Sequence, residues 1–276
     1  MTIKACVIGW PIEHSRSPLI HGYWLRHHGI DGSYTKEAVE PENLVDFLKG
    51  LDANGFAGCN VTVPHKEAAL AQADRADETA QTIGAANTLW IEGDALCATN
   101  TDAYGFLANL DASAPGWSDG TGSAVVLGAG GAARAVIQGL RERGIDDIRL
   151  VNRTLERAEA LASHFGDVSV LPWSSAAAAL VDCGLLVNTT SLGMAGAPAL
   201  ELPLDDLPAT AVVHDIVYVP LETDLLARAR ARGNRTVDGL GMLLHQAVPG
   251  FEKWFGVRPD VSDALRSLVV ADLQNG

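Results

Sequence analysis

Residues 123–154 constrain the fold of this chain most, because they read as a strand, a glycine-rich turn, a helix and a second strand in close succession. The apolar run 123–127 predicts a buried parallel strand, and the turn at 128–133 leads into a segment that favours a helix as far as Arg143. The next strand is expected at 148–151. A glycine-rich turn between a strand and a helix is typical of a dinucleotide-binding βαβ unit.

The small residues of this turn have separate expected roles. Gly128 allows the tight turn, Gly130 lets backbone N–H groups approach a pyrophosphate, and Ala133 permits close packing of the helix on the strand. The helix N-terminus adds partial positive charge for the phosphates. The residues expected at the pyrophosphate are therefore Gly128, Ala129, Gly130, Gly131, Ala132 and Ala133.

The end of the second strand indicates which dinucleotide is bound. An NAD site usually places an acidic residue there for the ribose 2′-hydroxyl, whereas this chain has Asn152, Arg153 and Thr154, with Arg157 one helical turn later. Two guanidinium groups without a carboxylate favour a 2′-phosphate, and therefore NADP(H) over NAD(H). The alternative is an ordinary strand–turn–helix with surface arginines.

Composition limits the other function classes. Four widely spaced cysteines (Cys6, Cys59, Cys97 and Cys183) form no C-x-x-C pair, which argues against a disulfide framework or a zinc site, and no metal site is expected. With no leader pattern and no apolar run of about 18 residues, a cytoplasmic protein is expected, away from the membrane. The net charge of −14 argues against nucleic acid or an anionic membrane as a partner. Independently of the charge, we expect a small-molecule partner and either a monomer or a homodimer.

The rest of the chain predicts an α/β fold of two domains. Apolar runs at 3–8, 33–38 and 58–63 alternate with helical segments at 17–29, 41–53 and 65–73, which indicates a mostly parallel sheet covered by helices. Residues 111–122 are rich in turn formers and predict a surface loop. Further strands are expected at 185–188 and 212–216 and a helix at 221–232; two last helices, 240–255 and 262–274, are placed with the N-terminal domain.

Polar residues follow the expected strands of the N-terminal domain. Ser15 and Ser17 stand at a helix start, where they could hold a carboxylate or merely cap the helix. Lys66 ends the Asn60-Val-Thr-Val-Pro-His-Lys66 segment, and from that segment alone a solvated lysine and a functional ammonium are equally favoured. Asn87 and Asp102 each lie beside another apolar run, so Lys66, Asn87 and Asp102 could converge on one polyol, with Asp102 keeping Lys66 charged.

Taken in order, these segments resemble the shikimate dehydrogenase family from one end of the chain to the other. The matching motifs are G-W-P-I-E-H-S-R-S-P, N-V-T-V-P-H-K, G-A-A-N-T, N-T-D, G-A-G-G-A-A, N-R-T, N-T-T-S-L-G-M, D-I-V-Y-V-P-L-E-T and G-L-G-M-L-L-H-Q-A. The resemblance implies a substrate domain (residues 1–102 and 239–276), a Rossmann-like NADP-binding domain (103–238) and C-terminal helices that return to the first domain. It also implies reversible, NADP-dependent hydride transfer between shikimate and 3-dehydroshikimate, in the chorismate pathway to aromatic amino acids.

The resemblance further implies roles for individual residues. Lys66 and Asp102 would be catalytic, Lys66 stabilising charge on the carbonyl oxygen and supplying the proton. The substrate would be bound by Ser15, Ser17, Asn60, Thr62, Lys66, Asn87, Asp102, Tyr218 and Gln246. Besides the turn and the Asn152–Arg157 group, the cofactor would contact Thr190, Ser191, Met194, Gly239 and Met242.

Two other functions fit the same motifs. The first is a related dehydrogenase that accepts quinate or uses NAD(H). Quinate differs from shikimate by a single hydroxyl, and NAD(H) differs from NADP(H) by the phosphate. A dinucleotide-sensing protein that has lost catalysis would keep the fold, although it would be expected to have lost Lys66 or Asp102, which are both present.

Overall fold

The computed structural model describes residues 2–275, which divide into two compact units. Unit 1 comprises Met1–Thr101 and Leu244–Gly276, and unit 2 comprises Asp102–Leu243. The chain passes from unit 1 to unit 2 one residue before the expected position. It returns to unit 1 five residues after the expected position, inside helix α9 (Leu240–Phe255). Among the helices of residues 2–275, none has the length and apolar character needed to cross a membrane.

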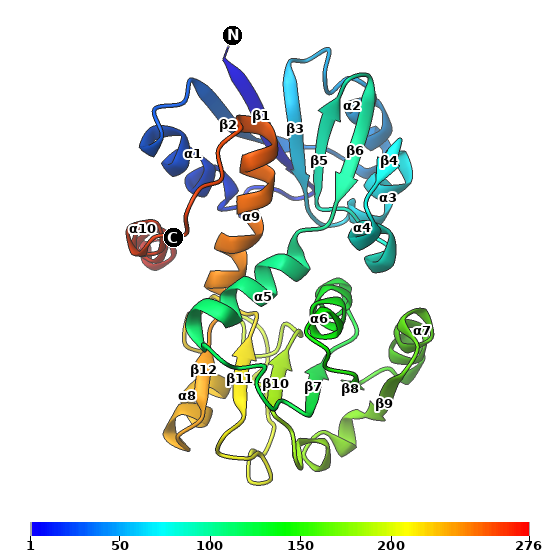
Figure 1. Ribbon diagram of the computed structural model, residues 1–276, viewed down its shortest axis with the longest axis vertical. Coiled ribbons are helices and arrows are strands. Elements are labelled where there is room, and N and C mark those ends of the chain that lie inside the picture. Colours follow the sequence, from blue (N-terminus) through cyan, green and yellow to red (C-terminus); the bar gives the residue numbers. More distant parts are fainter. Residues whose placement is uncertain (1, 276) are drawn as a thin grey trace. The chain divides into compact units, whose positions relative to one another are not determined.

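Unit 1 is built on a six-stranded sheet with the strand order β2-β1-β3-β5-β6-β4 (Figure 1). Its strands are β1 (Ile3–Gly9), β2 (Gly32–Ala38), β3 (Phe56–Val61), β4 (Arg75–Ala76), β5 (Thr88–Glu92) and β6 (Ala95–Thr99). Its helices are α1 (Ser17–His27), α2 (Leu44–Lys49), α3 (Lys66–Gln72), α4 (Glu78–Ile83), α10 (Asp263–Asn275) and the 3-10 turn η1 (Pro41–Asn43). Only β5 runs against the other strands, which confirms the mostly parallel sheet.

The register of this sheet gathers the polar segments at one edge. Asn60, near the end of β3, lies opposite Thr88 at the start of β5, and Thr88 lies opposite Thr99 at the end of β6. The carboxyl ends of β1 and β3 meet at the same edge because these two strands are parallel neighbours. Since β1 lies between β2 and β3, the strand order reverses there, and open α/β sheets bind ligands at such a reversal.

Helices cover both faces of the unit 1 sheet. On one face, Ile8, Cys59 and Val61 pack against Leu44 and Leu48 of α2. On the other face an aromatic cluster joins α1, β2 and α9, and its rings belong to His21, Trp24, Tyr34, Phe251 and Trp254. The Trp254 indole also donates to the Leu89 carbonyl (2.9 Å), which ties α9 to β5.

Gly58 permits this attachment of α9, so Gly58→Ala is expected to destabilise the protein by about 3 kcal/mol. A Cβ at Gly58 would overlap the Leu89 carbonyl oxygen and the Trp254 indole nitrogen, so their hydrogen bond would break. Gly122→Ala is the matched control, because no described atom lies within 4 Å of its added Cβ. Urea unfolding of both variants measures the difference, and equal stability of the two would contradict this account.

Unit 2 is a second six-stranded sheet, with the order β12-β11-β10-β7-β8-β9 and every neighbouring pair parallel. Its strands are β7 (Ser123–Leu127), β8 (Asp147–Asn152), β9 (Val168–Pro172), β10 (Leu185–Asn188), β11 (Val212–Asp215) and β12 (Arg235–Val237). Its helices are α5 (Asp102–Ser113), α6 (Gly131–Glu142), α7 (Leu155–Phe165), α8 (Asp224–Ala231) and the 3-10 turns η2 (Trp173–Ser175) and η3 (Ala178–Leu180). In chain order this is 3-2-1-4-5-6, the doubly wound Rossmann order, and it reverses between β7 and β10.

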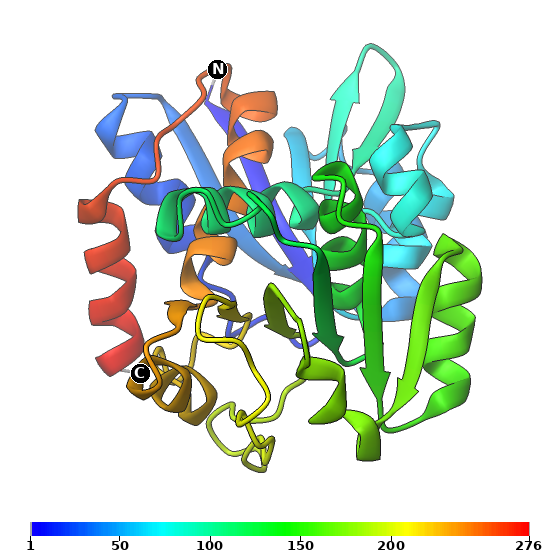
Figure 2. The same ribbon diagram turned by 60° about the horizontal axis from the view of Figure 1, so that its bottom comes forward.

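The buried strands of unit 2 present alternate side chains to two cores. Ala124 and Val126 of β7 face the core formed with α5, α6 and α7, whereas Val125 and Leu127 face the core formed with α8 and the segments before it. Figure 2 shows α7 alongside β9 and β8 at one end of this sheet. Because both faces are covered, the strands read as continuous apolar runs, which is why β7 and β10 were predicted well from sequence.

Two sequence predictions need correction. The helix expected over 41–53 is the 3-10 turn η1 followed by the short α2, which ends where Gly50 serves as its C-cap. The loop expected over 111–122 begins inside α5 and is partly core, because Trp117 is buried against Phe106 and donates to Asp111 (2.9 Å). Turn formers thus indicated a loop close to its observed start after Ser113, but they did not reveal α5 or how much of this segment is buried.

Two buried histidines predict the acid sensitivity of folding. Burial lowers the pKa of His21 from 6.5 to about 3 and that of His214 from 6.5 to about 4. The unfolded chain therefore binds protons below pH 6.5 that the folded chain does not, so stability falls as the pH drops from 6.5 toward 4. Each histidine contributes a slope of about 1.4 kcal/mol per pH unit.

His214→Gln isolates one of these contributions. The Gln side chain can still accept from the Asn109 amide, which donates to His214 Nε2 (3.3 Å), but it does not titrate. Urea unfolding between pH 6 and pH 4 is expected to show a slope shallower by about 1.4 kcal/mol per pH unit than that of the wild type. An unchanged slope would mean that His214 is not held neutral in the folded protein.

Candidate active site

The loop after β1 brings Ser15 and Ser17 to the start of α1. Ser17 is buried and Ser15 is half-buried, and Ser15 Oγ accepts from the Ser17 backbone N–H (3.3 Å). Arg16 is the N-cap residue, and its side chain makes no capping hydrogen bond within the described residues. Ser15 therefore performs part of the capping function, whereas the Ser17 hydroxyl lies one position inside the helix.

Asn60 is held by two other segments of unit 1, β2 and the chain at the start of β5. Its Oδ1 accepts from the Tyr34 hydroxyl (2.5 Å), while its Nδ2 donates to the Asn87 carbonyl (3.2 Å) and to Thr88 Oγ1 (3.1 Å). The amide is buried, and these contacts fix which way it points. Asn60 thus orders the neighbouring segments. The sequence analysis missed this role, because its expected site residues do not include the partners Tyr34 and Thr88.

Asn87 in turn fixes the chain that leads to Asp102. Its Oδ1 accepts from the Thr101 backbone N–H (2.9 Å), the Thr101 hydroxyl (3.1 Å) and the Thr88 hydroxyl (2.9 Å). The Thr101 hydroxyl has a single proton, which it shares between Asn87 Oδ1 and the Gln246 carbonyl (2.8 Å), so the expected substrate residue Gln246 is anchored through its backbone. Asp102, the next residue along the chain, is half-buried and begins α5.

Lys66 is the first residue of α3 and is half-buried. A cation at a helix N-terminus opposes the helix dipole, so this position does not serve helix stability. The backbone carbonyl of Lys66 accepts from the Ala86 N–H (2.9 Å), which ties the lysine to the segment before Asn87. The neighbouring His65 is buried with Nε2 2.7 Å from the Val39 carbonyl, so it faces the core. Thr62 is half-buried, and its N–H donates to the Ile8 carbonyl (2.9 Å).

In unit 2 the glycine turn has an open backbone. Gly128 has a φ of +99°, and an added Cβ would lie 2.8 Å from Thr190, so glycine is required there. At Gly130 and Gly131 an added Cβ would meet no described atom within 4 Å, and both residues are exposed. Gly130 caps α6, whose first turn contains no acidic residue, and Ala133 is fully buried as expected for close packing. This backbone fits a pyrophosphate.

Asn152, which is expected at the adenosine phosphate, connects two loops. Its Oδ1 accepts from the Ala129 N–H (3.2 Å), and its Nδ2 donates to the Thr154 carbonyl (2.7 Å). These bonds hold the glycine turn beside the β8–α7 loop. The neighbouring Thr154 is the exposed N-cap residue of α7, and its hydroxyl makes no capping bond within residues 2–275.

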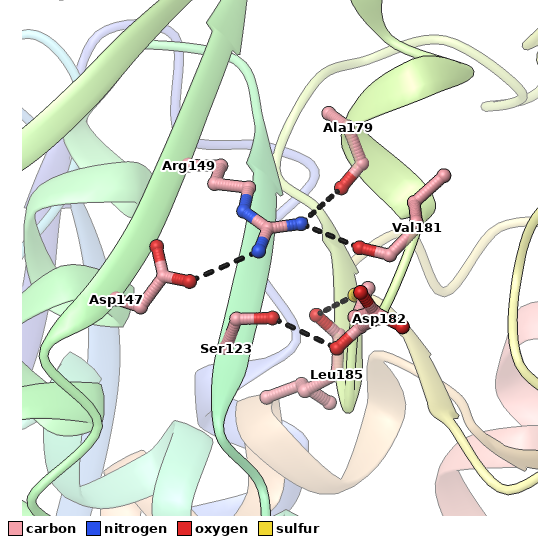
Figure 3. Close-up of polar contacts among 8 residues, drawn as sticks. Ser123, Asp147, Arg149, Ala179, Val181, Asp182 and Leu185 are labelled. Atoms are coloured by element: carbon pink, nitrogen blue, oxygen red, sulfur yellow. Dashed lines mark hydrogen bonds and ion pairs between the residues drawn. The ribbon is translucent and has the colours of Figure 1, made fainter.

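Arginines in β8 and in the segment after it form two groups. Figure 3 shows Arg149 donating to the carbonyls of Ala179 (2.9 Å) and Val181 (2.7 Å) and to Asp147 (3.0 Å). This cluster lies near the start of β8 and stabilises the fold by joining that strand to the segment at Ala179–Val181. Arg153 and Arg157 follow the carboxyl end of β8, are exposed, and have no carboxylate at ion-pair distance among the described residues. Their positive charge is thus available for a phosphate.

The segment after β10 and the segment after β11 are joined to each other. Thr190 donates through its N–H (3.0 Å) and its hydroxyl (2.7 Å) to Asn188 Oδ1, which shapes the turn to Ser191 and Met194. Ser191 is exposed and Met194 is 44% exposed. The Ala195 N–H donates to the Val219 carbonyl (2.8 Å), next to the half-buried Tyr218.

Gly239 directly precedes α9, and Met242 lies in the first turn of that helix. A Cβ on Gly239 would overlap the Ile216 backbone, so the turn before α9 packs directly on the chain that follows β11. The Asp238 carbonyl just before it accepts from the buried Asn109 amide (2.7 Å). Met242 is half-buried and packs against the core of α5 and α6.

The fold and these residues define a class of protein: an α/β protein with a Rossmann unit suited to a phosphorylated dinucleotide and a second unit whose sheet edge presents hydroxyls, amides and a lysine. Family models match three parts of the chain: the shikimate dehydrogenase substrate binding domain at residues 7–89, shikimate / quinate 5-dehydrogenase at 118–194, and the shikimate 5′-dehydrogenase C-terminal domain at 239–268. The chain belongs to the shikimate dehydrogenase family.

Individual relatives are similar over nearly their whole length. Shikimate dehydrogenase (NADP(+)) of Rhodopseudomonas palustris strain HaA2 is 63% identical over 98% of this chain and 96% of its own. The crystal structure of shikimate 5-dehydrogenase from Thermus thermophilus, in complex with NADP(H) and shikimate, is 38% identical, with a TM-score of 0.86 and 99% of each chain covered. Quinate dehydrogenase from Corynebacterium glutamicum in complex with NAD is 30% identical, with a TM-score of 0.91 and coverage of 98% and 99%.

Proposed function

We propose that this protein catalyses the reversible NADP-dependent reduction of 3-dehydroshikimate to shikimate. One observation carries the proposal: a shikimate dehydrogenase (NADP(+)) matches 98% of the chain at 63% identity, a span that includes both the lysine-bearing edge and the Rossmann turn. The proposal rests on this likeness over nearly the whole chain, because the fold alone would not define a reaction.

The cofactor is proposed to bind at the strand-order reversal of unit 2. Gly128 to Ala133 would hold the pyrophosphate on open backbone at the N-terminus of α6. Arg153 and Arg157, with Thr154, would bind the 2′-phosphate, and Asn152 would hold this loop against the glycine turn. Thr190, Ser191, Met194, Gly239 and Met242 are proposed for the nicotinamide half. When bound, NADPH supplies the hydride.

The substrate is proposed to bind at the polar edge of unit 1. The hydroxyls of Ser15 and Ser17 would accommodate the carboxylate at the start of α1, with Tyr218 as a further donor. The ring hydroxyls would be bound by Lys66, Asn87, Asp102 and Gln246, with Thr62 lining the pocket. Asn60 supports this set chiefly by holding Tyr34, Asn87 and Thr88 in place.

Lys66 and Asp102 are proposed as the catalytic pair. Negative charge develops on the carbonyl oxygen as the carbon is reduced, and the Lys66 ammonium would stabilise this charge and donate a proton to the oxygen. Asp102 would favour the charged form of Lys66 and orient the substrate hydroxyl. In the oxidative direction, Lys66 would accept the hydroxyl proton as the neutral amine and become the ammonium.

Quinate remains a second candidate substrate because a quinate dehydrogenase that binds NAD shares the fold at a TM-score of 0.91. Quinate carries one additional hydroxyl on the carbon that bears the carboxylate, so discrimination would occur around Ser15 and Ser17. The free-energy difference by which a binding site rejects a substrate with one added hydroxyl is modest. The exposed arginine pair after β8 favours NADP(H) over NAD(H) in either case.

We further propose that the protein works in the cytoplasm, as a monomer or a homodimer, in the pathway that supplies chorismate. Its four cysteines are free and buried, which suits a reducing compartment.

Genetic complementation tests the biosynthetic role. Expression in a bacterium that lacks its own shikimate dehydrogenase is expected to restore growth without added aromatic amino acids, and the Lys66→Ala variant is expected not to restore it. Failure of the well-expressed wild type to restore growth would remove the chain from this pathway.

A further inference from the structure

Asp215 ends β11 with a carboxylate that is wholly buried, at 0% exposure. Both of its oxygens accept hydrogen bonds. Oδ1 accepts from Asn188 Nδ2 (2.9 Å) and the Val217 N–H (3.1 Å), and Oδ2 accepts from the Thr223 hydroxyl (2.7 Å). Burial raises the pKa of this carboxyl group while these donors act in the opposite direction. Burying a carboxylate is costly, and here three donors offset part of that cost.

The first branch of this network shapes the turn after β10. Asn188, also 0% exposed, donates to Asp215 and to the Leu192 carbonyl (3.2 Å) through Nδ2, which fixes the orientation of its amide. Its Oδ1 is then placed to accept from the N–H and the hydroxyl of Thr190. The Thr190 hydroxyl accepts from the Leu192 N–H (3.0 Å), which closes the turn.

The second branch shapes the segment after β11. By accepting from the Val217 N–H, Asp215 turns the chain just before Tyr218. The Val217 carbonyl accepts from the Gly239 N–H (3.3 Å), so the turn before α9 is held by the same segment. Thr223, the third donor, caps α8 by accepting from the Leu226 N–H (3.4 Å). One carboxylate thus connects the Thr190 turn, the Tyr218 segment and the Gly239 turn.

We infer that Asp215 is a positioning residue for hydride transfer: it sets the placement of the turn at Thr190–Met194 relative to the segment at Val217–Tyr218. This inference rests on the proposed function, which assigns both segments to the nicotinamide and substrate contacts. Asp215 does not touch either ligand in this account, and it acts through Asn188 and the Val217 backbone. Displacements of about 1 Å in such groups can lower a rate about 100-fold.

Three substitutions separate this role from ordinary structural support. Asp215→Asn keeps Oδ1 as the acceptor for Asn188 and Val217, and its new amide can donate to Thr223, so the geometry is retained. Asp215→Ala leaves all three donors without their acceptor. Asn188→Ala breaks only the branch to Thr190 and keeps the bonds of Asp215 to Val217 and Thr223.

Asn234→Ala is the matched control. The Asn234 amide is buried like Asp215 and donates to the carbonyls of Pro208 (2.8 Å) and Ala211 (2.9 Å). These residues precede β11 and β12, at the opposite edge of the sheet from the proposed contacts. A comparable loss of stability is expected, without movement of either loop.

The kinetic test measures kcat and the primary deuterium isotope effect for oxidation of shikimate with NADP⁺. We expect Asp215→Ala and Asn188→Ala to lower kcat by about 10- to 100-fold and to raise the isotope effect, because hydride transfer becomes slower. Asp215→Asn is expected to stay within about threefold of the wild type, and Asn234→Ala to keep the wild-type isotope effect. If kcat of Asp215→Ala falls no further than that of Asn234→Ala, the positioning role is wrong.

Amide hydrogen exchange of the ligand-free protein gives an independent readout. Asp215→Ala is expected to speed exchange by about tenfold or more at 189–195 and 217–219, Asn188→Ala only at 189–195, and Asn234→Ala at neither. Unchanged exchange in the first two variants would overturn the inference. A wild type that does not turn over shikimate would refute the proposed function instead, and the exchange results would still decide whether Asp215 orders these loops.

Discussion

Lys66→Ala is expected to lower kcat for shikimate oxidation by about 10²–10⁴-fold, with a smaller change in KM. The range is that for loss of a positioned acid–base group, because Lys66 would both stabilise the developing oxyanion and transfer its proton. Steady-state kinetics with NADP⁺ measure the effect. The substitution leaves the backbone contact to the Ala86 N–H intact, so the segment before Asn87 is expected to stay in place.

Lys49→Ala is the control for this prediction. Lys49 is an exposed lysine at the end of α2, so its loss changes the net charge by the same amount without reaching the polar edge of unit 1. It is expected to keep wild-type kcat. A near-normal kcat for a folded Lys66→Ala variant would remove Lys66 from the catalytic role.

Arg153→Asp is expected to weaken NADP⁺ binding about 100-fold and NAD⁺ binding much less. The two cofactors differ only in the 2′-phosphate, and the substitution replaces a charge-assisted donor with a carboxylate that repels that phosphate. Isothermal titration of each cofactor against wild type and variant measures the two losses.

Arg26→Asp makes the matching charge reversal on α1 of unit 1, where the arginine is exposed. It is expected to leave the ratio of NADP⁺ to NAD⁺ affinity unchanged, which separates a local phosphate contact from the effect of net charge. Equal losses for NADP⁺ and NAD⁺ in Arg153→Asp would mean that another residue binds the 2′-phosphate.

Much of the fold could be predicted from local sequence. The strands β7 and β10, buried on both faces, appear as short apolar runs, and α9 was predicted with its observed bounds. The β5–β6 hairpin was missed, although Gly93 and Asp94 between the two strands are a recognised hairpin signal, and Gly93 indeed has a φ of +64°. The short edge strands β9 and β12 have too little apolar pattern to be found by periodicity.

The internal supports of the site could not be predicted in the same way. The orientation of the Asn60 amide depends on Tyr34, 26 residues away, and on Thr88, 28 residues away, which only the folded sheet brings together. The same holds for Asp215, whose partner Asn188 lies 27 residues earlier on a neighbouring strand. Asn152 is a further case: the phosphate contact that its position suggests stays a prediction, and only the folded chain shows that its amide also joins two loops.

The central claim is tested most directly by initial rates for four pairs: shikimate or quinate, each with NADP⁺ or NAD⁺. The account predicts turnover largely confined to shikimate with NADP⁺. Comparable rates with quinate or NAD⁺ would contradict the proposed specificity and assign the protein to the broader dehydrogenases of this family. No turnover with any pair, while NADP⁺ still binds, would contradict the catalytic roles of Lys66 and Asp102.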